Sequence, residues 1–174
     1  LTINKMCGSG LKALMLAEEA IISGNADIII AGGMENMSRS PHILLNSRTG
    51  NKMGDFKLID SMIHDGLWDI YNDEHMGSCG ELCAEKYNFS RKEQDDYAKI
   101  SYARSQKATE ENIFNNEITS VDVINGKKTI TINEDEEPFR VKFDKIESLN
   151  PVFKKEGTIT PANASTLNDG AAAC

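Results

Sequence analysis

A cysteine stands just ahead of the first helix that the sequence predicts. Cys7 is followed by Gly8 and Gly10 in the stretch NKMCGSGLKALMLAEEA, residues 4–20. A thiol becomes a strong nucleophile when it ionises, and the free N–H groups and positive dipole end of a helix's first turn favour the thiolate. The glycines leave room for another backbone or a ligand to approach. Cys7 is therefore either an activated nucleophile or a buried structural cysteine, which is the commoner role.

A second group of residues has types that bind metal. His75, Cys79 and Cys83 are spaced i, i+4, i+8, so one face of a helix would present all three. A single helix supplies poor tetrahedral geometry, and no fourth ligand is evident, which argues against zinc. We expect this segment to be a helix packed beside a cleft.

The composition limits the classes of function. The chain has 174 residues, a net charge of −8 and 40% apolar residues, which is typical of about one globular domain. The acidic balance argues against nucleic acid as a partner, and no apolar stretch is long enough to cross a membrane. The four cysteines match no secreted disulfide framework. Since the chain begins at Leu1 and stops just after an alanine run, we expect a piece of a longer protein without its targeting end.

The elements that would position Cys7 follow from the hydrophobic pattern. Residues 10–23 predict a helix that is buried on most sides, ended by Gly24. Residues 28–33, IIIAGG, predict a strand of a parallel sheet covered on both faces. With LTIN as the end of a preceding strand, the unit is expected to be β–α–β with a right-handed crossover.

The rest of the chain is predicted to be a long segment of mixed helix, strand and loop, followed by a segment that returns to the β–α–β unit. Residues 34–76 have weak periodicity and predict irregular structure. Ser90 and Glu93 form a capping box, which predicts a helix from 91 to about 111. The pair Asn125-Gly126 predicts a hairpin over 118–133, and 134–137 is expected to be a solvated loop. In 157–173 the only strand expected is 158–160.

Several segments, in order, resemble the thiolase family. They are NKMCGSGLKA with ADIIIAGGMENMS, RTGNKMGDFKLID, GLWDIYNDEHMGSC, SRKEQDDYA and KEGTITPANASTLNDGAAA. The resemblance covers nearly the whole chain and is closest to the biosynthetic, potassium-activated members. It implies an α/β fold with αβαβα layers, of which this chain holds the later part of the N-terminal half. Residues 1–38 would be part of the N-terminal domain, 39–156 an inserted loop domain and 157–174 the return into the N-terminal domain.

The resemblance also implies an activity. Cys7 would accept an acetyl group from acetyl-CoA, and a second acetyl-CoA would then attack the thioester to give acetoacetyl-CoA, which is the reaction of an acetyl-CoA C-acetyltransferase. The C-terminal half, with the catalytic histidine and the second catalytic cysteine, is absent, so the chain alone is expected to be inactive. The alternatives are a degradative 3-ketoacyl-CoA thiolase and a non-catalytic thiolase-like protein that binds CoA or lipid. Bulky Phe153 and Met76 favour a short acyl group.

The family match assigns further site residues. Those expected along the acyl group and pantetheine are Leu67, His75, Met76, Val152, Phe153, Ser165 and Leu167, although a core role is the alternative for Phe153. Those expected at the adenine and phosphate end of CoA are Arg140, Val141, Lys142 and Lys145, although a solvated face is the alternative for Lys145. Potassium would be held by Tyr102 and by the carbonyls of Pro161, Ala162 and Ala164, although a core role is the alternative for Tyr102. The resemblance implies no organic cofactor, a homotetramer through residues 48–60, a role in lipid metabolism, and a mitochondrial or cytoplasmic location.

Overall fold

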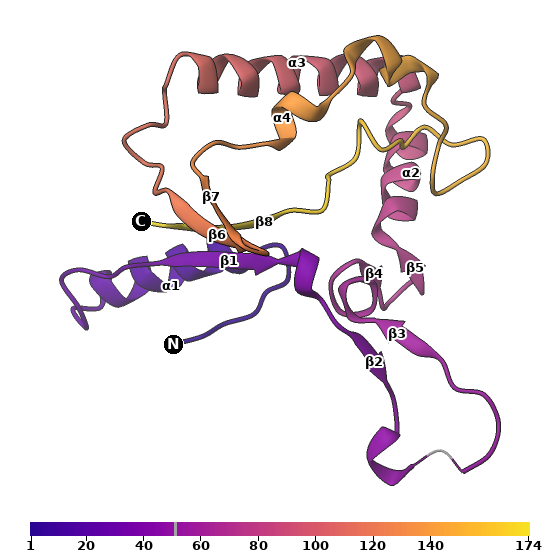
Figure 1. Cartoon of the computed structure of the whole chain (residues 1–174), viewed down its shortest axis with the longest axis horizontal. Coiled ribbons are helices and arrows are strands. Elements are labelled where there is room, and N and C mark those ends of the chain that lie inside the picture. The colour runs from indigo at the N-terminus through magenta and orange to yellow at the C-terminus, as the bar shows by residue number, and fades with distance from the viewer. Residues whose placement is uncertain (51) are drawn as a thin grey trace. The chain divides into compact units, whose positions relative to one another are not determined.

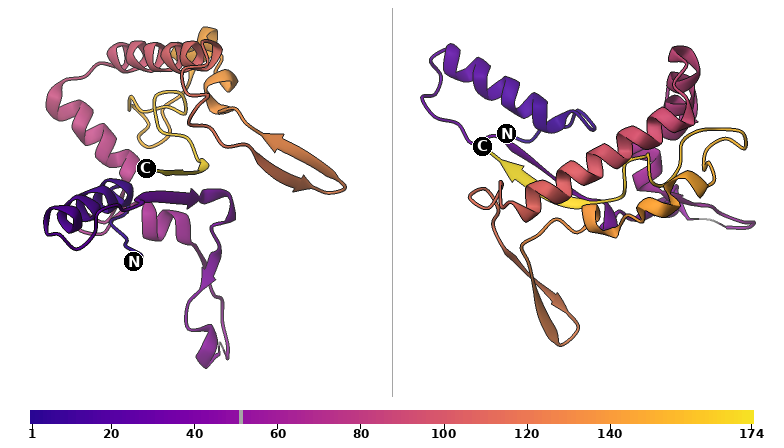
Figure 2. Two further views of the ribbon diagram at one scale, coloured as in Figure 1. Left: turned by 90° about the vertical axis from the view of Figure 1, so that its left-hand side faces the viewer. Right: turned by 90° about the horizontal axis from the view of Figure 1, so that it is seen from above.

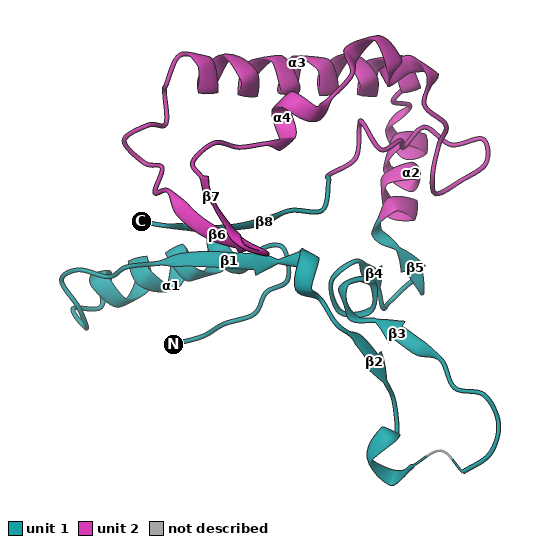
Figure 3. Ribbon diagram, viewed as in Figure 1, with its two compact units in different colours: residues 1–76, 166–174 teal, residues 77–165 magenta. Residues whose placement is uncertain are grey.

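The chain divides into two compact units. The structure, a computed structural model, describes residues 1–50 and 52–174. One unit comprises residues 1–76 and 166–174, and the other comprises residues 77–165 (Figure 3). The division expected from the family resemblance, at residues 38 and 156, remains a prediction about the fold of a whole thiolase.

The secondary structure mixes helices and strands (Figure 1). The α-helices are α1 (Ser9–Ile22), α2 (Met76–Tyr87), α3 (Arg91–Glu110) and α4 (Glu137–Arg140). The strands are β1 (Gly32–Asn36), β2 (His42–Leu44), β3 (Leu58–Asp60), β4 (Trp68–Asp69), β5 (Glu74–His75), β6 (Val121–Asn125), β7 (Lys128–Ile132) and β8 (Asp169–Ala173). Short 3-10 helices lie at Met37–Arg39, Ser47–Thr49 and Phe143–Ser148, and a π-helix lies at Met62–Gly66. None of the helices in the described ranges has both the length and the apolar character needed to cross a bilayer.

Helix α1 ends where the sequence predicts. Gly24 has a φ of +70°, and its N–H donates to the carbonyl of Ile21 at 3.0 Å. The N–H of Asn25 donates to the carbonyl of Ala20 at 2.9 Å. These two bonds form a Schellman motif, in which glycine adopts the left-handed conformation without steric cost. The prediction of this helix and of its C-terminal glycine is confirmed.

The predicted burial of α1 is wrong for the described chain. No residue of α1 is buried, and Leu11 and Ile22 are 68% and 77% exposed. Strand β1 packs against α1 (Figure 2), with Gly33 so close to Gly10 that an added Cβ would lie 3.6 Å from the Gly10 Cα. A single strand covers only one side of a helix, so the apolar residues on its other sides stay in solvent.

The predicted parallel strand is also wrong. Strand β1 begins at Gly32, after the apolar run, and it pairs with β8 in antiparallel register from Gly32↔Ala173 to Asn36↔Asp169. Residues 1–4 form no strand, so the expected β–α–β unit is not present. The pairing extends to Ala31 and Cys174, which exchange two 2.8 Å backbone bonds.

Strand β8 was not predicted, because Asp, Gly and Ala are depleted in strands. Pairing with β1 holds it, and the contact is so close that a Cβ on Gly32 would lie 2.4 Å from the carbonyl oxygen of Ala172. Ser38 donates to the Asp169 carboxylate from its N–H at 3.0 Å and from its hydroxyl at 2.5 Å. The same two donors hold the pKa of Asp169 below its usual range.

The second unit contains the elements with the strongest local signals. Ser90 caps α3, and its capping box with Glu93 is complete, as predicted. Strands β6 and β7 form the predicted hairpin, with Asn125 opposite Lys128. Gly126 has a φ of +63° and is the first loop residue, which matches a type II′ turn. Residues 158–160, predicted to be a strand, instead form an extended loop held by side chains of α2 and α3.

Candidate functional site

Cys7 lies in a turn that precedes α1. Gly8 is the N-cap of the helix, and its N–H donates to the carbonyl of Lys5 at 3.1 Å. The Ser9 hydroxyl accepts the N–H of Lys5 at 2.8 Å and donates to the carbonyl of Met6 at 2.7 Å. All these hydrogen bonds join residues of the turn to one another. The Cys7 side chain is exposed. An accessible thiol beside a helix N-terminus suits a nucleophile, and the buried structural alternative is wrong for the described chain.

Three residues expected along pantetheine meet in the first unit. The carbonyl of Leu67 accepts the N–H of Met76 at 2.9 Å, and His75 pairs with Trp68 across the β4–β5 ladder. Leu67 and His75 are partly buried, whereas Met76 is 40% exposed. Leu167, in the same unit, is 62% exposed. His75 precedes α2, so the prediction of one helix face that carries His75 with the two cysteines is wrong.

The residues expected at the acyl end lie in the second unit. The N–H of Val152 donates to the carbonyl of Ile159 at 3.0 Å. The ring of Phe153 lies against the backbone of Gly77, where an added Cβ would be 2.4 Å from its ring carbons. Gly77 was not singled out from the sequence, because nothing local distinguishes it from other helix glycines. Ser165 is exposed at the end of the unit.

The basic residues expected at the phosphates lie on one short stretch. Arg140 ends α4, Val141 follows it, and Lys142 precedes the 3-10 helix that contains Lys145. The cationic side chains are exposed, and Arg140 forms an ion pair with Glu136. An accessible set of cations suits contacts to phosphate, which Arg and Lys commonly bind.

The residues expected at potassium lie on α3 and in the loop at 161–164. In the part of the chain that the structure describes, the carbonyl oxygens of Pro161, Ala162 and Ala164 accept no hydrogen bond, so they are suitable ligands for a hard cation. Tyr102, however, bonds with Glu137, and its ring meets Phe143 edge-on at 6.4 Å. Burial, the charge of Glu137 and that hydrogen bond raise the pKa of Tyr102. Among the described residues, no hydrogen bond joins Tyr102 to Pro161, Ala162 or Ala164.

A carboxylate that sequence reasoning missed anchors the loop beside this site. Glu81 of α2 is 4% exposed, and it accepts the N–H groups of Thr158 and Ile159 at 2.9 Å and the Thr158 hydroxyl at 3.0 Å. Burial alone would raise the pKa of Glu81, but these donors and the charge of Lys154 outweigh it and lower the pKa. Glu81 thus holds the start of the 158–165 segment as a carboxylate.

This lowered pKa predicts a pH dependence. The stabilisation by the Glu81 carboxylate is complete above its ordinary pKa of about 4.3 and is lost as the pH falls through the lower folded-state value. Replacing Glu81 with Gln should reduce the free energy of unfolding at pH 7 by about 1–2 kcal/mol. The difference from the unsubstituted protein should shrink toward pH 3, as urea unfolding would measure.

Glu85 provides the matched control for that experiment. It lies on the same helix, forms an ion pair with Lys154, and its side chain is 57% exposed. Exposed pairs contribute little, so Glu85→Gln should change the stability much less at either pH. An equal loss of stability for Glu81→Gln at pH 7 and pH 3 would contradict the role of the charge.

Comparisons with known proteins identify the family of the chain. The model of the thiolase N-terminal domain matches residues 1–174. The mitochondrial acetyl-CoA acetyltransferase of Mus musculus is 50% identical over 99% of this chain and 41% of its own length. That of Homo sapiens is 50% identical over 40% of its length, and the probable acetyl-CoA acetyltransferase of Escherichia coli is 48% identical over 44%. The chain thus spans about two fifths of these relatives. Because the domain model covers every residue, the chain belongs to the thiolase family.

Proposed function

We propose that the protein that carries this chain is an acetyl-CoA C-acetyltransferase, which condenses two acetyl-CoA molecules into acetoacetyl-CoA and CoA. The observation that carries this proposal is the exposed Cys7 in a self-closed turn at the N-terminus of α1. The names of the similar acetyltransferases support the choice of acetyl-CoA as substrate.

The reaction would proceed in two half-reactions. The Cys7 thiolate attacks the carbonyl carbon of acetyl-CoA, the carbon–sulfur bond to CoA breaks, and CoA leaves as a thiolate that takes up a proton. A second acetyl-CoA then loses a methyl proton to a base, and its carbon attacks the acetyl-Cys7 thioester. Acetoacetyl-CoA forms and the Cys7 thiolate is restored. Covalent catalysis of this kind replaces one difficult step by two easier ones.

The chain's other residues would bind the CoA thioester. Arg140, Lys142 and Lys145 would contact the phosphates, and Val141 the adenine. The residues that would contact pantetheine are Leu67, His75, Met76, Ser165 and Leu167. Val152 and Phe153 would border the acyl group, and the close approach of Gly77 to the Phe153 ring supports a fixed wall there.

The remaining proposals rest on the family resemblance. Pro161, Ala162 and Ala164, with Tyr102, would hold potassium, whose charge would order the adjacent loop. Residues 48–60 would form a tetramer contact; residue 51 of this stretch lies outside the described residues. The base for the methyl proton would come from the C-terminal half of a thiolase, so the 174-residue chain by itself would not turn over. The location would be mitochondrial or cytoplasmic.

The test uses the full-length protein that contains this chain. Thiolysis should be fastest with acetoacetyl-CoA and should fall steeply with longer 3-ketoacyl-CoA substrates, because Phe153 and Met76 limit the acyl space. Faster cleavage of long-chain substrates would favour a degradative thiolase. Binding of CoA without any CoA-dependent cleavage would favour a non-catalytic protein. Rates compared in KCl and NaCl at equal ionic strength would test the potassium proposal.

A further inference from the structure

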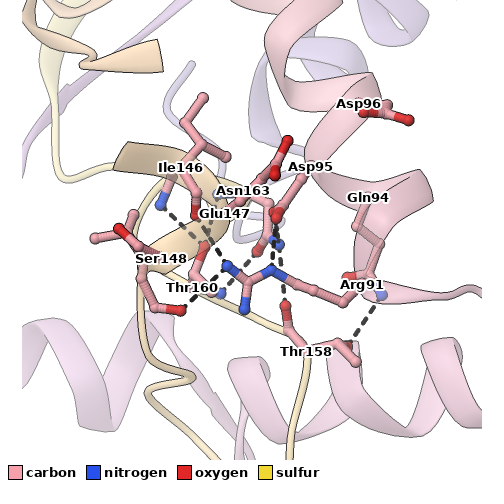
Figure 4. Close-up of polar contacts among 12 residues, drawn as sticks. Arg91, Gln94, Asp95, Asp96, Ile146, Glu147, Ser148, Thr158, Thr160 and Asn163 are labelled. Atoms are coloured by element: carbon pink, nitrogen blue, oxygen red, sulfur yellow. Dashed lines mark hydrogen bonds and ion pairs between the residues drawn. The ribbon is translucent and has the colours of Figure 1, made fainter. Parts of the chain in front are cut away.

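A buried carboxylate in α3 joins two segments of the second unit. Asp95 is 2% exposed, and each of its oxygens accepts a hydrogen bond (Figure 4). Oδ2 accepts from the Arg91 Nε at 2.7 Å, and Oδ1 accepts from the Asn163 Nδ2 at 2.9 Å. A buried carboxylate is tolerated when it is paired in this way, and removing its partners or its charge is costly.

The Arg91 side of this network holds the segment that follows the basic stretch. The Arg91 Nη2 donates to the carbonyls of Ile146 at 2.9 Å and Leu149 at 3.1 Å. Ile146 is completely buried and lies in the same 3-10 helix as Lys145. Val152 follows within a few residues. Arg91 therefore fixes the backbone between the proposed phosphate contacts and the proposed acyl wall.

The Asn163 side holds the segment that leads to Ser165. The Asn163 Nδ2 also donates to the carbonyl of Thr158 at 3.0 Å, and its Oδ1 accepts the N–H of Thr160 at 2.7 Å. The N–H of Ala164 donates to the carbonyl of Thr160 at 3.0 Å. A carboxylate can only accept hydrogen bonds, so the Asn163 side chain turns its amide nitrogen toward Asp95. The Asn163 oxygen is then placed to accept the N–H of Thr160.

We propose that Asp95 is a positioning residue for the CoA site. Through Arg91 and Asn163 it sets the geometry of two segments, one next to Lys145 of the proposed phosphate contacts and one leading to Ser165 of the proposed pantetheine contacts. This inference rests on the proposed function. The turn that carries Cys7 is closed by its own local hydrogen bonds, which this network does not share, so removing the network should weaken CoA binding more than it slows the chemical step.

Replacing Asp95 with Asn in the full-length protein tests this role. Arg91 and Asn163 donate to different oxygens of Asp95, and an amide replaces one of these oxygens with an NH2 donor. Either one link is lost, or the Asn163 amide turns round and gives up its bonds to Thr158 and Thr160. We expect the KM for CoA in acetoacetyl-CoA thiolysis to rise about 5- to 10-fold, as for the loss of about one hydrogen bond, while kcat changes less than about 2-fold. A residue with a merely structural role would lower the amount of active enzyme and leave KM unchanged.

Asp96 is the matched control. It is the next residue on α3, it pairs with Lys92 at 2.5 Å with its side chain 44% exposed, and it points away from the network in Figure 4. Asp96→Asn should leave KM unchanged. If Asp95→Asn does not fold, Asn163→Ala decides the matter, because it removes one link and keeps the Arg91–Asp95 pair.

The outcomes separate the two proposals. An unchanged KM in Asp95→Asn and Asn163→Ala, an equal rise of KM in Asp96→Asn, or a fall of kcat alone would overturn the positioning role and leave the proposed function standing. If the unsubstituted full-length protein shows no CoA-dependent cleavage, the proposed function fails and the positioning role falls with it.

Discussion

Replacing Cys7 with Ala is expected to lower the kcat of the full-length protein on the order of 10³-fold or more, because the nucleophile that carries the acyl group is removed. Cys7→Ser should be nearly as inactive, since a serine hydroxyl ionises far less readily than a thiol. Incubation with acetyl-CoA followed by peptide mass spectrometry should find the acetyl group on Cys7 in the unsubstituted protein and on neither variant.

Cys83 is a suitable control for that substitution. It is also an exposed free thiol, but it lies within α2 and not ahead of a helix N-terminus. Cys83→Ala should therefore retain both the thiolysis rate and the acetyl adduct. Acetylation of Cys83 together with retained activity of Cys7→Ala would refute the assignment of the nucleophile.

The parts of the fold that could be predicted from sequence are those whose signals lie within a few residues. Gly24 ends α1, Ser90 and Glu93 cap α3, and Gly126 turns the hairpin, each through its own backbone conformation or through bonds to near neighbours. Such signals do not depend on the rest of the chain. The apolar run at 28–31 carried no such signal, and its assignment to a parallel strand was wrong.

The remainder depends on distant partners. Strand β8 consists of Asp, Gly and Ala, and it forms because its backbone pairs with that of β1. The burial expected for α1 needed covering elements that its own sequence does not specify. In the candidate site, the choice of Cys7 as a candidate followed from the local pattern, which left its exposure or burial open. Glu81 and Asp95 did not, because an acidic residue on a helix has the same sequence pattern whether it faces solvent or a buried set of donors.

The largest effect on stability is expected at Gly157, beside one of those buried acids. A Cβ added there would lie 2.2 Å from the Glu81 Oε1 and 2.9 Å from the carbonyl oxygen of Lys154. The carboxylate would have to move and would lose its bonds to Thr158 and Ile159, while the backbone contact would remain. Gly157→Ala should therefore lower the free energy of unfolding by about 2–4 kcal/mol, as urea denaturation would measure.

Gly80 allows the same substitution to be made without the clash. It lies within α2, and an added Cβ would make an ordinary 3.5 Å contact with the Ile159 side chain. Because alanine favours a helix over glycine, Gly80→Ala should stabilise the protein by about 0.5–1 kcal/mol. If Gly157→Ala were as stable as the unsubstituted protein, the close packing of Glu81 against the loop would be wrong. In a protein that already carries Glu81→Ala, Gly157→Ala should lower the free energy of unfolding by only about 1 kcal/mol more, because only the close contact with Lys154 remains.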